Sequence, residues 1–450
     1  MPRVAITTIG THGDVQPFVA LARAMQHRGI SVVIGSTSDF ADFVRASGIE
    51  FCDLGGDVQA FISQAKFDNV MSKGALLQAP ALLRAGQAVL KNAARRAWQM
   101  SEGADAIIFQ VNTTFCIDIA QARQIPAFLT VFQPMQPTTE FPYFGYEGPR
   151  IDPYLYRISR QPFARAPSID PLINKLSYVA QAAAQLYWDM PRDRLRRAMG
   201  LKSRRKGNVL RNYNGKPLNT LHAYSPALSP APGDWPETNV VTGFWRFADE
   251  SGWQPSPELE AFLARGDKPV YIGFGSMSWG AQRNSDVIRK ALDLWGGRAI
   301  VSKGWGGLRA EALPENVFMV DRAPHSELFR HVRGVVHHGG AGTTHTGLYL
   351  GLPTFIVPQF YDQPYWGKLV YDLGCGPAPV RIKKLTPQIL ATALEDLTTT
   401  PSYARAAALI AERMGLEDGT NRAVDVIEET IAEHAPRPLA NDPHLIGAAL

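Results

Sequence analysis

The 450-residue sequence lacks the features of membrane-spanning, exported and disulfide-stabilised proteins. No apolar stretch approaches the roughly 18–20 residues needed to cross a bilayer. The first residues, MPRVAITTIG, run straight into a strand-like segment without the apolar core and cleavage site of a signal peptide. The three cysteines, Cys52, Cys116 and Cys375, are widely scattered and form neither a disulfide framework nor a zinc pattern. We therefore expect a cytoplasmic protein.

A common nucleotide-binding signature is also missing from the N-terminal half. The first strand-to-helix turn, residues 9–17, reads IGTHGDVQP, which is not the G-x-G-x-x-G dinucleotide fingerprint. The second predicted strand ends in Ser36 and Thr37, where a dinucleotide-binding domain would carry an acid for the ribose. We therefore do not expect the first half to bind a dinucleotide.

Charge is sparse and unevenly placed, with 19% charged residues and a net charge of +5. The segment Arg192–Lys216 alone holds ten Lys/Arg and a single acid, Asp193. Two interpretations stay open for it: a solvated helix and loop, or peripheral contact with an anionic membrane surface. Nucleic acid is not an expected partner, because no aromatic interleaving or recognised binding module accompanies the charge.

What the sequence does contain is two successive strand–helix patterns. The chain is too long for one ordinary core, so two domains of about 200 residues are expected. The stretch SPALSPAPGDWP, residues 225–236, has four prolines and cannot continue a helix or a central strand. We predict an α/β fold of two doubly wound Rossmann-like domains, 1–224 and 239–418, facing across a cleft and joined by a linker at 225–238. The predicted strands are 4–8, 30–35, 106–109 and 127–131, then 269–274, 299–302, 317–320, 335–338 and 354–358.

Residues 337–366, HHGGAGTTHTGLYLGLPTFIVPQFYDQPYW, combine a strand end, a glycine-rich turn, a helix and a second strand. This order aims backbone N–H groups and a helix N-terminus at an anion, to which His338 and Thr343 can add side-chain donors. Asp362 and Gln363 follow the second strand at the same sheet edge, where they can hold hydroxyl groups. A sugar diphosphate fits these parts. The alternative is that the glycines, Gly340 and Gly342 among them, only permit a tight turn.

This ordered set resembles the donor-binding signature of the nucleotide-sugar glycosyltransferases of GT-B fold, family 1, in particular the sterol glucosyltransferases and the antibiotic-tailoring glycosyltransferases of bacteria. The resemblance covers about residues 1–40 and 225–375 and is weak over 60–220. It implies a GT-B fold, a nucleotide-sugar donor and an enzyme that is a UDP-dependent hexosyltransferase. It also implies that a final helix, about 419–436, crosses back to the first domain.

The resemblance extends to the first turn, because the string G-[ST]-x-G-D-V-x-P opens the same enzymes. It implies that Asp14 is the general base that takes the proton from an acceptor hydroxyl. His12, two residues earlier, either shares that role or caps the turn. Asp14 also has a structural interpretation, since an acid in the first helical turn complements the helix dipole.

Further donor-binding residues follow from the resemblance alone. Ser276 would contact the diphosphate, Trp305 would lie in the nucleobase pocket or pack in the interior, and the backbone of Ala323 would meet the base edge. Thr346 stands where plant relatives place a Glu on the ribose. The donor is therefore expected to be a UDP-sugar, with a TDP-sugar as the alternative.

No two aspartates have the D-x-D spacing of metal-clamped donor sites, so we expect neither a metal nor a cofactor. The resemblance implies inverting transfer, with glucose favoured, to a lipophilic hydroxylated acceptor such as a sterol, macrolide or lipid. No acceptor-binding residue is assigned. Two alternatives stay open: a nucleotide-sugar epimerase or hydrolase on the same fold, and a non-catalytic sugar-nucleotide binding protein.

Overall fold

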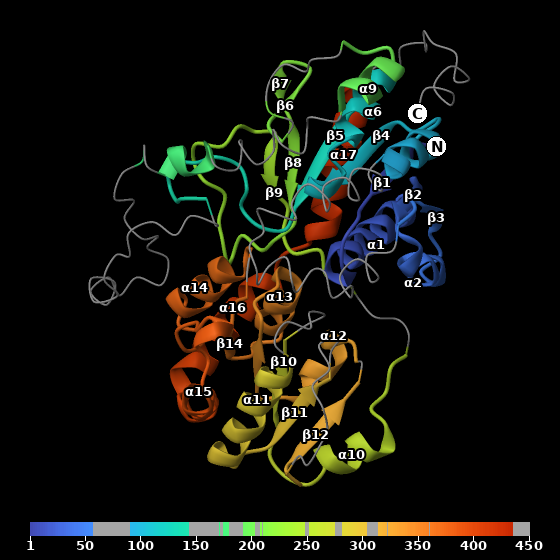
Figure 1. Cartoon of the computed structure of the whole chain (residues 1–450). Helices are drawn as coiled ribbons and strands as arrows, with labels where there is room; N and C mark the ends of the chain where they lie inside the picture. Colours follow the sequence, from blue (N-terminus) through green and yellow to red (C-terminus); the bar gives the residue numbers. More distant parts are fainter. Residues whose placement is uncertain are drawn as a thin grey trace.

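The computed structural model describes most of the chain, and its two parallel sheets form two α/β domains, one above the other in Figure 1. The described residues are 1–56, 91–143, 171, 174–179, 192–202, 208, 210–247, 252–274, 281–303, 314–321, 323–359 and 361–434. The predicted α/β architecture of two Rossmann-like domains is confirmed, because every strand pair in both sheets is parallel and helices follow most of the described strands.

The first sheet has the strand order β3-β2-β1-β4-β5-β8-β9. Its central strands are β-branched, apolar runs with almost no exposed surface, as expected when helices cover both faces of a parallel sheet. The strands are β1 Arg3–Thr7, β2 Ser31–Ser36, β3 Glu50–Asp53, β4 Ala106–Gln110, β5 Ala127–Val131, β8 Asn219–His222 and β9 Asn239–Val241, with a separate hairpin of β6 Asn212–Tyr213 and β7 Lys216–Pro217.

The second sheet has the order β12-β11-β10-β13-β14, which places the strand before the glycine-rich turn, β13, beside the strand before Asp362, β14. Parallel neighbours end at the same edge, so both segments reach one side of the domain. The strands are β10 Val270–Gly273, β11 Ala299–Ser302, β12 Val317–Val320, β13 Gly334–His337 and β14 Thr354–Ile356.

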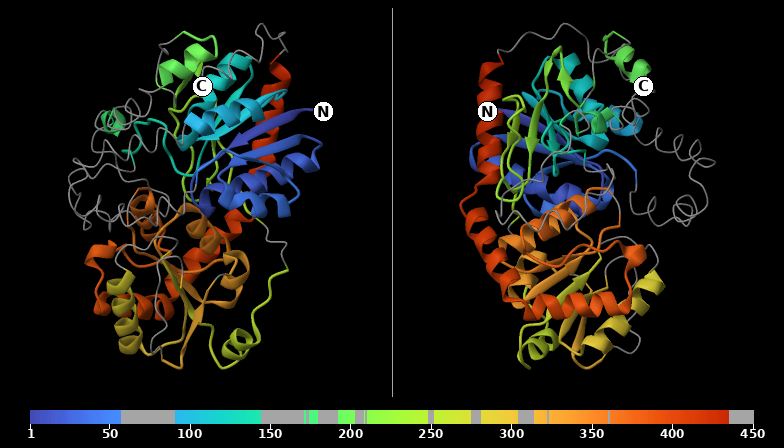
Figure 2. Two further views of the ribbon diagram at one scale, coloured as in Figure 1. Left: turned by 45° about the vertical axis from the view of Figure 1, so that its right-hand side comes forward. Right: turned by 90° about the vertical axis from the view of Figure 1, so that its left-hand side faces the viewer.

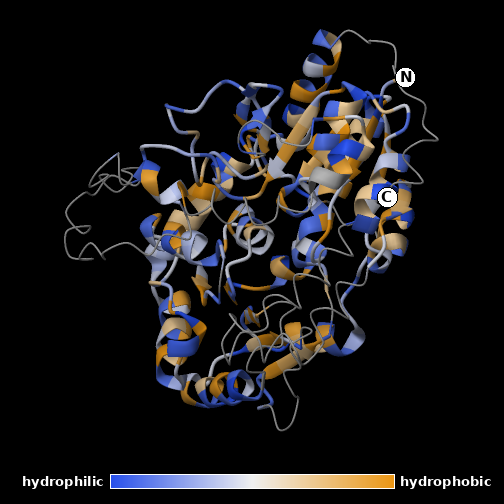
Figure 3. Ribbon diagram, turned by 45° about the horizontal axis from the view of Figure 1, so that its top comes forward, coloured by the Kyte–Doolittle hydropathy of each residue, from blue (hydrophilic) through white to orange (hydrophobic). Residues whose placement is uncertain are grey.

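Helices pack on both sheets and turn their apolar faces inward. Figure 3 shows mostly hydrophobic strands between helices whose exposed faces are hydrophilic. The helices are α1 His12–His27, α2 Ala41–Ala46, α6 Cys116–Arg123, α9 Arg192–Ala198, α10 Pro257–Leu263, α11 Ala281–Trp295, α12 His325–Leu328, α13 Ala341–Tyr349, α14 Gln363–Asp372, α15 Pro387–Thr399, α16 Pro401–Met414 and α17 Gly419–Glu433.

The predicted linker at 225–238 is corrected by the sheet topology. β9 pairs in parallel with β8, Leu221 opposite Val240, so the proline-rich segment joins two strands of the first sheet. The chain leaves the first sheet after Val241. The sequence could not indicate this because β9 has only three residues and lies at the sheet edge, where no long apolar run is needed.

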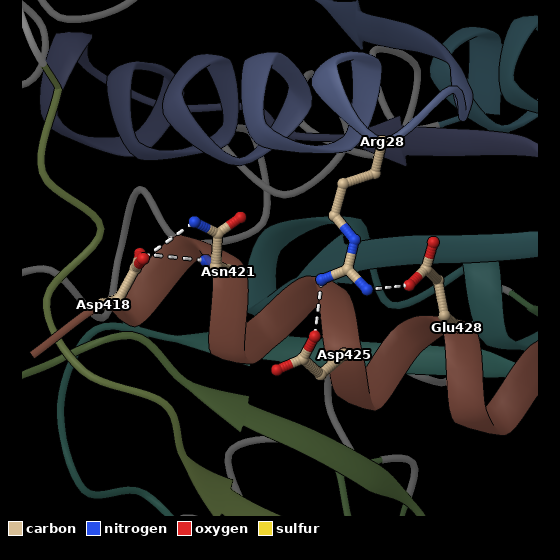
Figure 4. A network of polar contacts seen from close by, with 5 residues as sticks. All are labelled: Arg28, Asp418, Asn421, Asp425 and Glu428. Atoms are coloured by element: carbon tan, nitrogen blue, oxygen red, sulfur yellow. Dashed lines mark hydrogen bonds and ion pairs between the residues drawn. The ribbon is translucent and has the colours of Figure 1, made fainter.

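The helix α17 returns to the first domain and packs along α1 (Figures 1 and 2). Ala423, Val424 and Ile427 are fully buried in the core beneath α1, and burying a Val or Ile side chain contributes about 1.5–3 kcal/mol. Arg28 also reaches two carboxylates on α17, Asp425 and Glu428 (Figure 4). These ion pairs are partly exposed, so the apolar contact contributes most of the docking energy.

The two segments that pass between the domains, one after β9 and the other at the start of α17, contact one another. Gly243 has a φ of 111°, and a Cβ there would lie 2.9 Å from the Cα of Gly419. Glu417 accepts from the hydroxyl of Ser225 at 2.5 Å beside this contact. The ring of His345 in α13 accepts from the Ser225 N–H at 3.1 Å. A helix of the second domain is therefore bonded to the same residue, Ser225.

Candidate active site

The turn before α1 holds the carboxylate of Asp14 over its own backbone. Asp14 Oδ2 accepts from the N–H of Thr11 at 2.7 Å and from its hydroxyl at 3.0 Å. A side chain on Gly10 would place a Cβ 2.3 Å from that same oxygen, so glycine is required for this carboxylate position. The capping contacts start α1 at His12, six residues before the predicted helical spacing at Phe18.

Asp14 keeps some accessible surface although protein surrounds it. Burial raises the pKa of Asp14 above its usual value, and the two hydrogen bonds from Thr11 oppose that rise. A raised pKa makes a carboxylate a stronger proton acceptor. Asp14 therefore caps the helix with Oδ2, and its role as a general base stays a prediction.

His12 lies exposed at the first position of α1. Its ring packs against Phe43 with the centroids 4.8 Å apart. Its charge lowers the pKa of His325 in the second domain, so His12 faces that domain. The division of roles between His12 and Asp14 stays a prediction.

The turn before α13 also lies between a parallel strand and a helix, but it carries different side chains. Gly339 has a φ of 92°, and a Cβ there would lie 2.6 Å from Cγ2 of Ile356, so both conformation and space require glycine. His338 lies over Gly340, where a Cβ would be 2.6 Å from Nε2 of the histidine. Burial lowers the pKa of His338 to about 4, so the imidazole is neutral near pH 7. Its Nδ1 makes no hydrogen bond within the part of the chain that the structure describes.

The N-terminus of α13 carries no internal anion. Gly340 is the N-cap without a side-chain cap bond, and the first turn contains no acid. The first N–H groups of a helix lack intrahelical partners. A Cβ on Gly342 would meet no atom within 4 Å among the residues that the structure describes. Together with half-buried Thr343, this end of α13 could receive an anion.

Asp362 is the N-cap of α14 and lies at the sheet edge next to α13. Its Oδ2 accepts from the indole N–H of Trp366 at 2.9 Å. Burial raises the pKa of Asp362 to about 7, and the negative charge of Asp14 adds to the rise. The two carboxylates, one from each domain, are therefore near enough for their charges to interact.

The remaining residues predicted to bind the donor are Gln363, Ala323, Ser276 and Trp305. Gln363 is buried, and its Oε1 accepts from the N–H of Gln359 at 2.7 Å, so part of its amide supports the loop before α14. Ala323 packs partly buried against the core beneath β10 and α12. Ser276 and Trp305 lie outside the described residues, and their roles stay predictions. The Thr346 hydroxyl donates to the carbonyl of Gly342 at 2.8 Å.

Sequence reasoning missed two aromatic groups at this site. Tyr361 precedes Asp362 with a φ of 56°. Tyr143 lies near enough to Asp362 for that charge to raise its pKa, after burial, to about 12. The general richness of residues 135–175 in aromatic side chains was a signal for Tyr143 alone.

The basic segment Arg192–Lys216 is not one exposed face. Arg196 is buried in an ion pair with Asp118, and Arg211 donates to the carbonyl of Tyr178 at 3.4 Å. Arg197, Lys202 and Lys216 are exposed. Along the described ranges, no helix combines the length and the apolar character of a membrane span.

Comparison with known proteins accounts for both halves of the chain. Residues 4–138 match the glycosyltransferase family 28 N-terminal domain, and residues 305–431 match the erythromycin biosynthesis protein CIII-like C-terminal domain. The chain is 33% identical over 456 residues to the sterol 3-beta-glucosyltransferase UGT80B1 of Arabidopsis thaliana, covering 97% of this chain and 69% of that protein.

A bacterial relative and a solved structure agree with this assignment. The chain is 30% identical over 434 residues to the O-mycaminosyltylonolide 6-deoxyallosyltransferase of Streptomyces fradiae, with 95% of this chain and 97% of the relative covered. The crystal structure of the glycosyltransferase VinC in complex with DTDP superimposes with a TM-score of 0.64 at 18% identity, over 96% of this chain and all of that one. The chain therefore is an enzyme of GT-B fold and belongs to the glycosyltransferase family that contains the sterol glucosyltransferases and the antibiotic-tailoring glycosyltransferases.

Proposed function

We propose that the enzyme transfers a hexose, glucose in the first instance, from a UDP-sugar to a hydroxyl group of a lipophilic acceptor, with inversion and without a metal. The observation that carries this proposal is the pairing across the domains. Asp14 of the first domain and Asp362 of the second are close enough for one charge to raise the pKa of the other. The uncapped end of α13 lies at the same edge of the second sheet as Asp362.

The diphosphate would bind at the start of α13. The N–H groups of Gly342 and Thr343 and a ring nitrogen of His338 offer donors without a competing acid. A helix N-terminus with such donors stabilises the charge that develops on a leaving diphosphate. This arrangement supplies by hydrogen bonding the charge stabilisation that a metal supplies in other transferases, which supports the metal-independent proposal.

The hexose would lie between α14 and the first domain. Asp362 commits Oδ2 to Trp366, which leaves Oδ1 for a sugar hydroxyl. Because its pKa is about 7, this group can either donate or accept at neutral pH. Gln363 follows it in the chain, and its buried amide accepts from the N–H of Gln359 in the loop before α14.

Asp14 would act as the base in a single displacement. The acceptor oxygen forms a bond to the anomeric carbon, the bond from that carbon to the diphosphate oxygen breaks, and the acceptor proton passes to the Asp14 carboxylate. Attack opposite the leaving group inverts the anomeric configuration. General-base assistance of this kind is worth about 10²–10⁴-fold in rate.

The acceptor and the nucleoside are the finer parts of the proposal. The names of the relatives support a sterol or a macrolide-type acceptor, and exposed Arg197, Lys202 and Lys216 would allow contact with an anionic membrane that supplies such lipids. A TDP-sugar is the alternative donor. The similar solved structure holds DTDP. Thr346, which stands where plant relatives place a Glu on the ribose, bonds through its hydroxyl to its own helix.

The test is to incubate the purified protein with UDP-glucose or TDP-glucose and a panel of hydroxysteroids and macrolides, followed by mass spectrometry and NMR of the product. A β-glycoside formed from the α-linked donor in the presence of EDTA supports the proposal. Epimerised or hydrolysed donor without a glycoside would contradict it. A requirement for added divalent metal would remove the metal-independent part alone.

A further inference from the structure

His345 of α13 is a buried histidine that uses both of its ring nitrogens. Its Nδ1 lies 2.7 Å from the carbonyl oxygen of Ala341, and its Nε2 lies 3.1 Å from the backbone nitrogen of Ser225. A carbonyl oxygen can only accept and a backbone N–H can only donate, so the partners fix the tautomer: Nδ1 carries the proton and Nε2 accepts. Burial lowers the pKa of His345 to about 4, so the ring is neutral, as this pattern requires.

The two bonds of His345 lead to different parts of the enzyme. Ala341 is the first residue of α13, so the Nδ1 bond stays within the helix whose N-terminus is proposed to bind the diphosphate. Ser225 lies between β8 and β9 of the first sheet, so the Nε2 bond crosses from the second domain to the first. His345 therefore joins the proposed diphosphate helix directly to the backbone of the other domain.

The segment after β9 packs against both domains beside this bond. Phe244 stacks on the His345 ring, with the centroids 4.9 Å apart and the planes at 27°. The next residue, Trp245, is buried and meets Phe18 of α1 edge-on at 5.9 Å between centroids. Phe18 follows Asp14 by four residues on the same helix. Two successive residues thus contact the helix of the proposed diphosphate site and the helix of the proposed base.

The same alternation continues for two more residues. The guanidinium carbon of Arg246 lies 4.7 Å from the ring centroid of Tyr349 in α13. The Phe247 ring returns to the first domain, where its centroid lies 5.5 Å from that of Phe43 in α2. Residues 244–247 therefore form a two-sided spacer between α13 and the elements around the first turn, and the bond from His345 to the first domain lies beside this spacer.

We propose that His345 is a positioning residue for the transfer: the bond from the Ser225 N–H to its Nε2 holds α13, and with it the donor diphosphate, at a fixed place relative to α1 and Asp14. This inference rests on the proposed function. The acceptor oxygen beside Asp14 must reach the anomeric carbon of the donor, and a displacement of about 1 Å can cost about 10²-fold in rate. UDP would bind within the second domain, so its affinity should not depend on this bond.

A matched pair of variants separates the bond between the domains from the bond within α13. The amide of His345→Gln can place an acceptor near the position of Nε2 and so reach Ser225. The shorter amide of His345→Asn reaches only the position of Nδ1 and retains the bond to Ala341 alone. Both variants lose the ring that packs on Phe244 and on Trp366, so their melting temperatures should fall alike. The pair therefore differs in the bond to Ser225 and is matched in lost packing.

Steady-state kinetics and calorimetry give the first test. With saturating UDP-glucose and a hydroxysteroid acceptor, kcat should fall about 10-fold in His345→Asn and by less than about 3-fold in His345→Gln. The dissociation constant of UDP should stay within about 2-fold of wild type in both. Equal kcat values in the two variants would overturn the inference and leave the proposed function standing. A loss of UDP affinity that accounts for the loss of rate would overturn it too, because His345 would then act only on the phosphate end of α13.

A second measurement does not depend on turnover. Spin labels at exposed positions of the two domains, Asp42→Cys in α2 and Lys290→Cys in α11, report the distance between the domains in a Cys52→Ser background. The distance distribution of His345→Gln should match that of the labelled protein with His345, and the distribution of His345→Asn should shift or broaden. Identical distributions in all three would overturn the inference. If wild type glycosylates no acceptor, the proposed function fails, and the distances alone then decide whether His345 sets the position of α13.

Discussion

The turns before α1 and α13 are counterparts in the two domains, and they differ in what lies at the helix N-terminus. Both follow a central parallel strand, β1 or β13, and both are rich in glycine. At α1 the carboxylate of Asp14 already occupies the donors of Thr11. At α13 the first turn has no acid and no side-chain cap. One turn is occupied by its own carboxylate, and the other has no acid of its own.

A glycine makes room for the functional side chain in each turn. Gly10 leaves space for the Asp14 carboxylate, and Gly340 leaves space for the imidazole of His338. The same backbone feature thus leaves room for a carboxylate in one domain and for a neutral imidazole in the other. From this difference we predict that the diphosphate binds at the helix that lacks an internal anion, and four predictions can break or sharpen that comparison.

The largest effect is expected from Asp14→Asn. The amide retains the size of the carboxylate but cannot accept the acceptor proton, so transfer should fall about 10²–10⁴-fold while UDP affinity stays within 2-fold. Steady-state assays and calorimetry check the two parts. A loss of UDP affinity would show that the α1 turn also binds the donor and would remove the comparison.

The next effect is expected from Gly342→Val. No described residue fills the space above Gly342, so the fold should tolerate the side chain, but a bound diphosphate would meet it. UDP affinity should fall about 10-fold or more. The control is the smaller substitution Gly342→Ala, which should leave the melting temperature unchanged and give an intermediate UDP affinity. Gly48→Val is not a suitable control, because Gly48 has a φ of 73°. Normal UDP binding by Gly342→Val would place the diphosphate elsewhere.

A reciprocal pair of glycine variants should give about 10-fold effects. Gly10→Ala must displace the Asp14 carboxylate, so it should lower kcat without changing UDP affinity. Gly340→Ala must displace the His338 ring, so it should weaken UDP binding. Each variant serves as the control for the other. Two variants that lose both properties alike would indicate general loss of the fold, which circular dichroism distinguishes.

The smallest effect concerns stability and pH at Asp362. The folded protein holds the Asp362 proton up to about pH 7, whereas the unfolded chain releases it near the ordinary value of 3.8. The stability of wild type is therefore reduced as the pH rises from about 4 to about 7. Asp362→Asn lacks this loss. Its melting temperature should therefore exceed that of wild type by an amount that grows over that range, to about 2–4 °C, which corresponds to about 1 kcal/mol. Calorimetry at pH 5 and pH 8 measures it, and an advantage independent of pH would contradict the raised pKa.

Local patterns predicted several strands well. The limits of β5 and β11 agree with the apolar runs at 127–131 and 299–302, because buried parallel strands need continuous apolar side chains. The limits of the edge strand β12 agree with the run at 317–320. The edge strand β9 and the true crossing after Val241 carry no such pattern. They depend on pairing with β8, which is a tertiary contact.

The chemistry of the site was predicted less completely than the strands. The resemblance pointed to Asp14, His338 and Asp362, because their motifs are local in the sequence. The conformation of Tyr361 could not be predicted, since a φ of 56° is unfavourable for an aromatic residue and no local pattern requires it there. The pKa of Asp362 likewise depends on burial and on Asp14, which no local pattern reports.

The central claim is that the open helix end of α13, and not the closed end of α1, receives the donor diphosphate. A crystal structure of the enzyme with UDP tests this most directly. We predict phosphate oxygens within about 3.2 Å of the N–H groups of Gly342 and Thr343 and of a ring nitrogen of His338, with Asp14 still bonded to Thr11. A diphosphate bound at the Thr11 turn, with the Asp14 carboxylate displaced, would contradict the account.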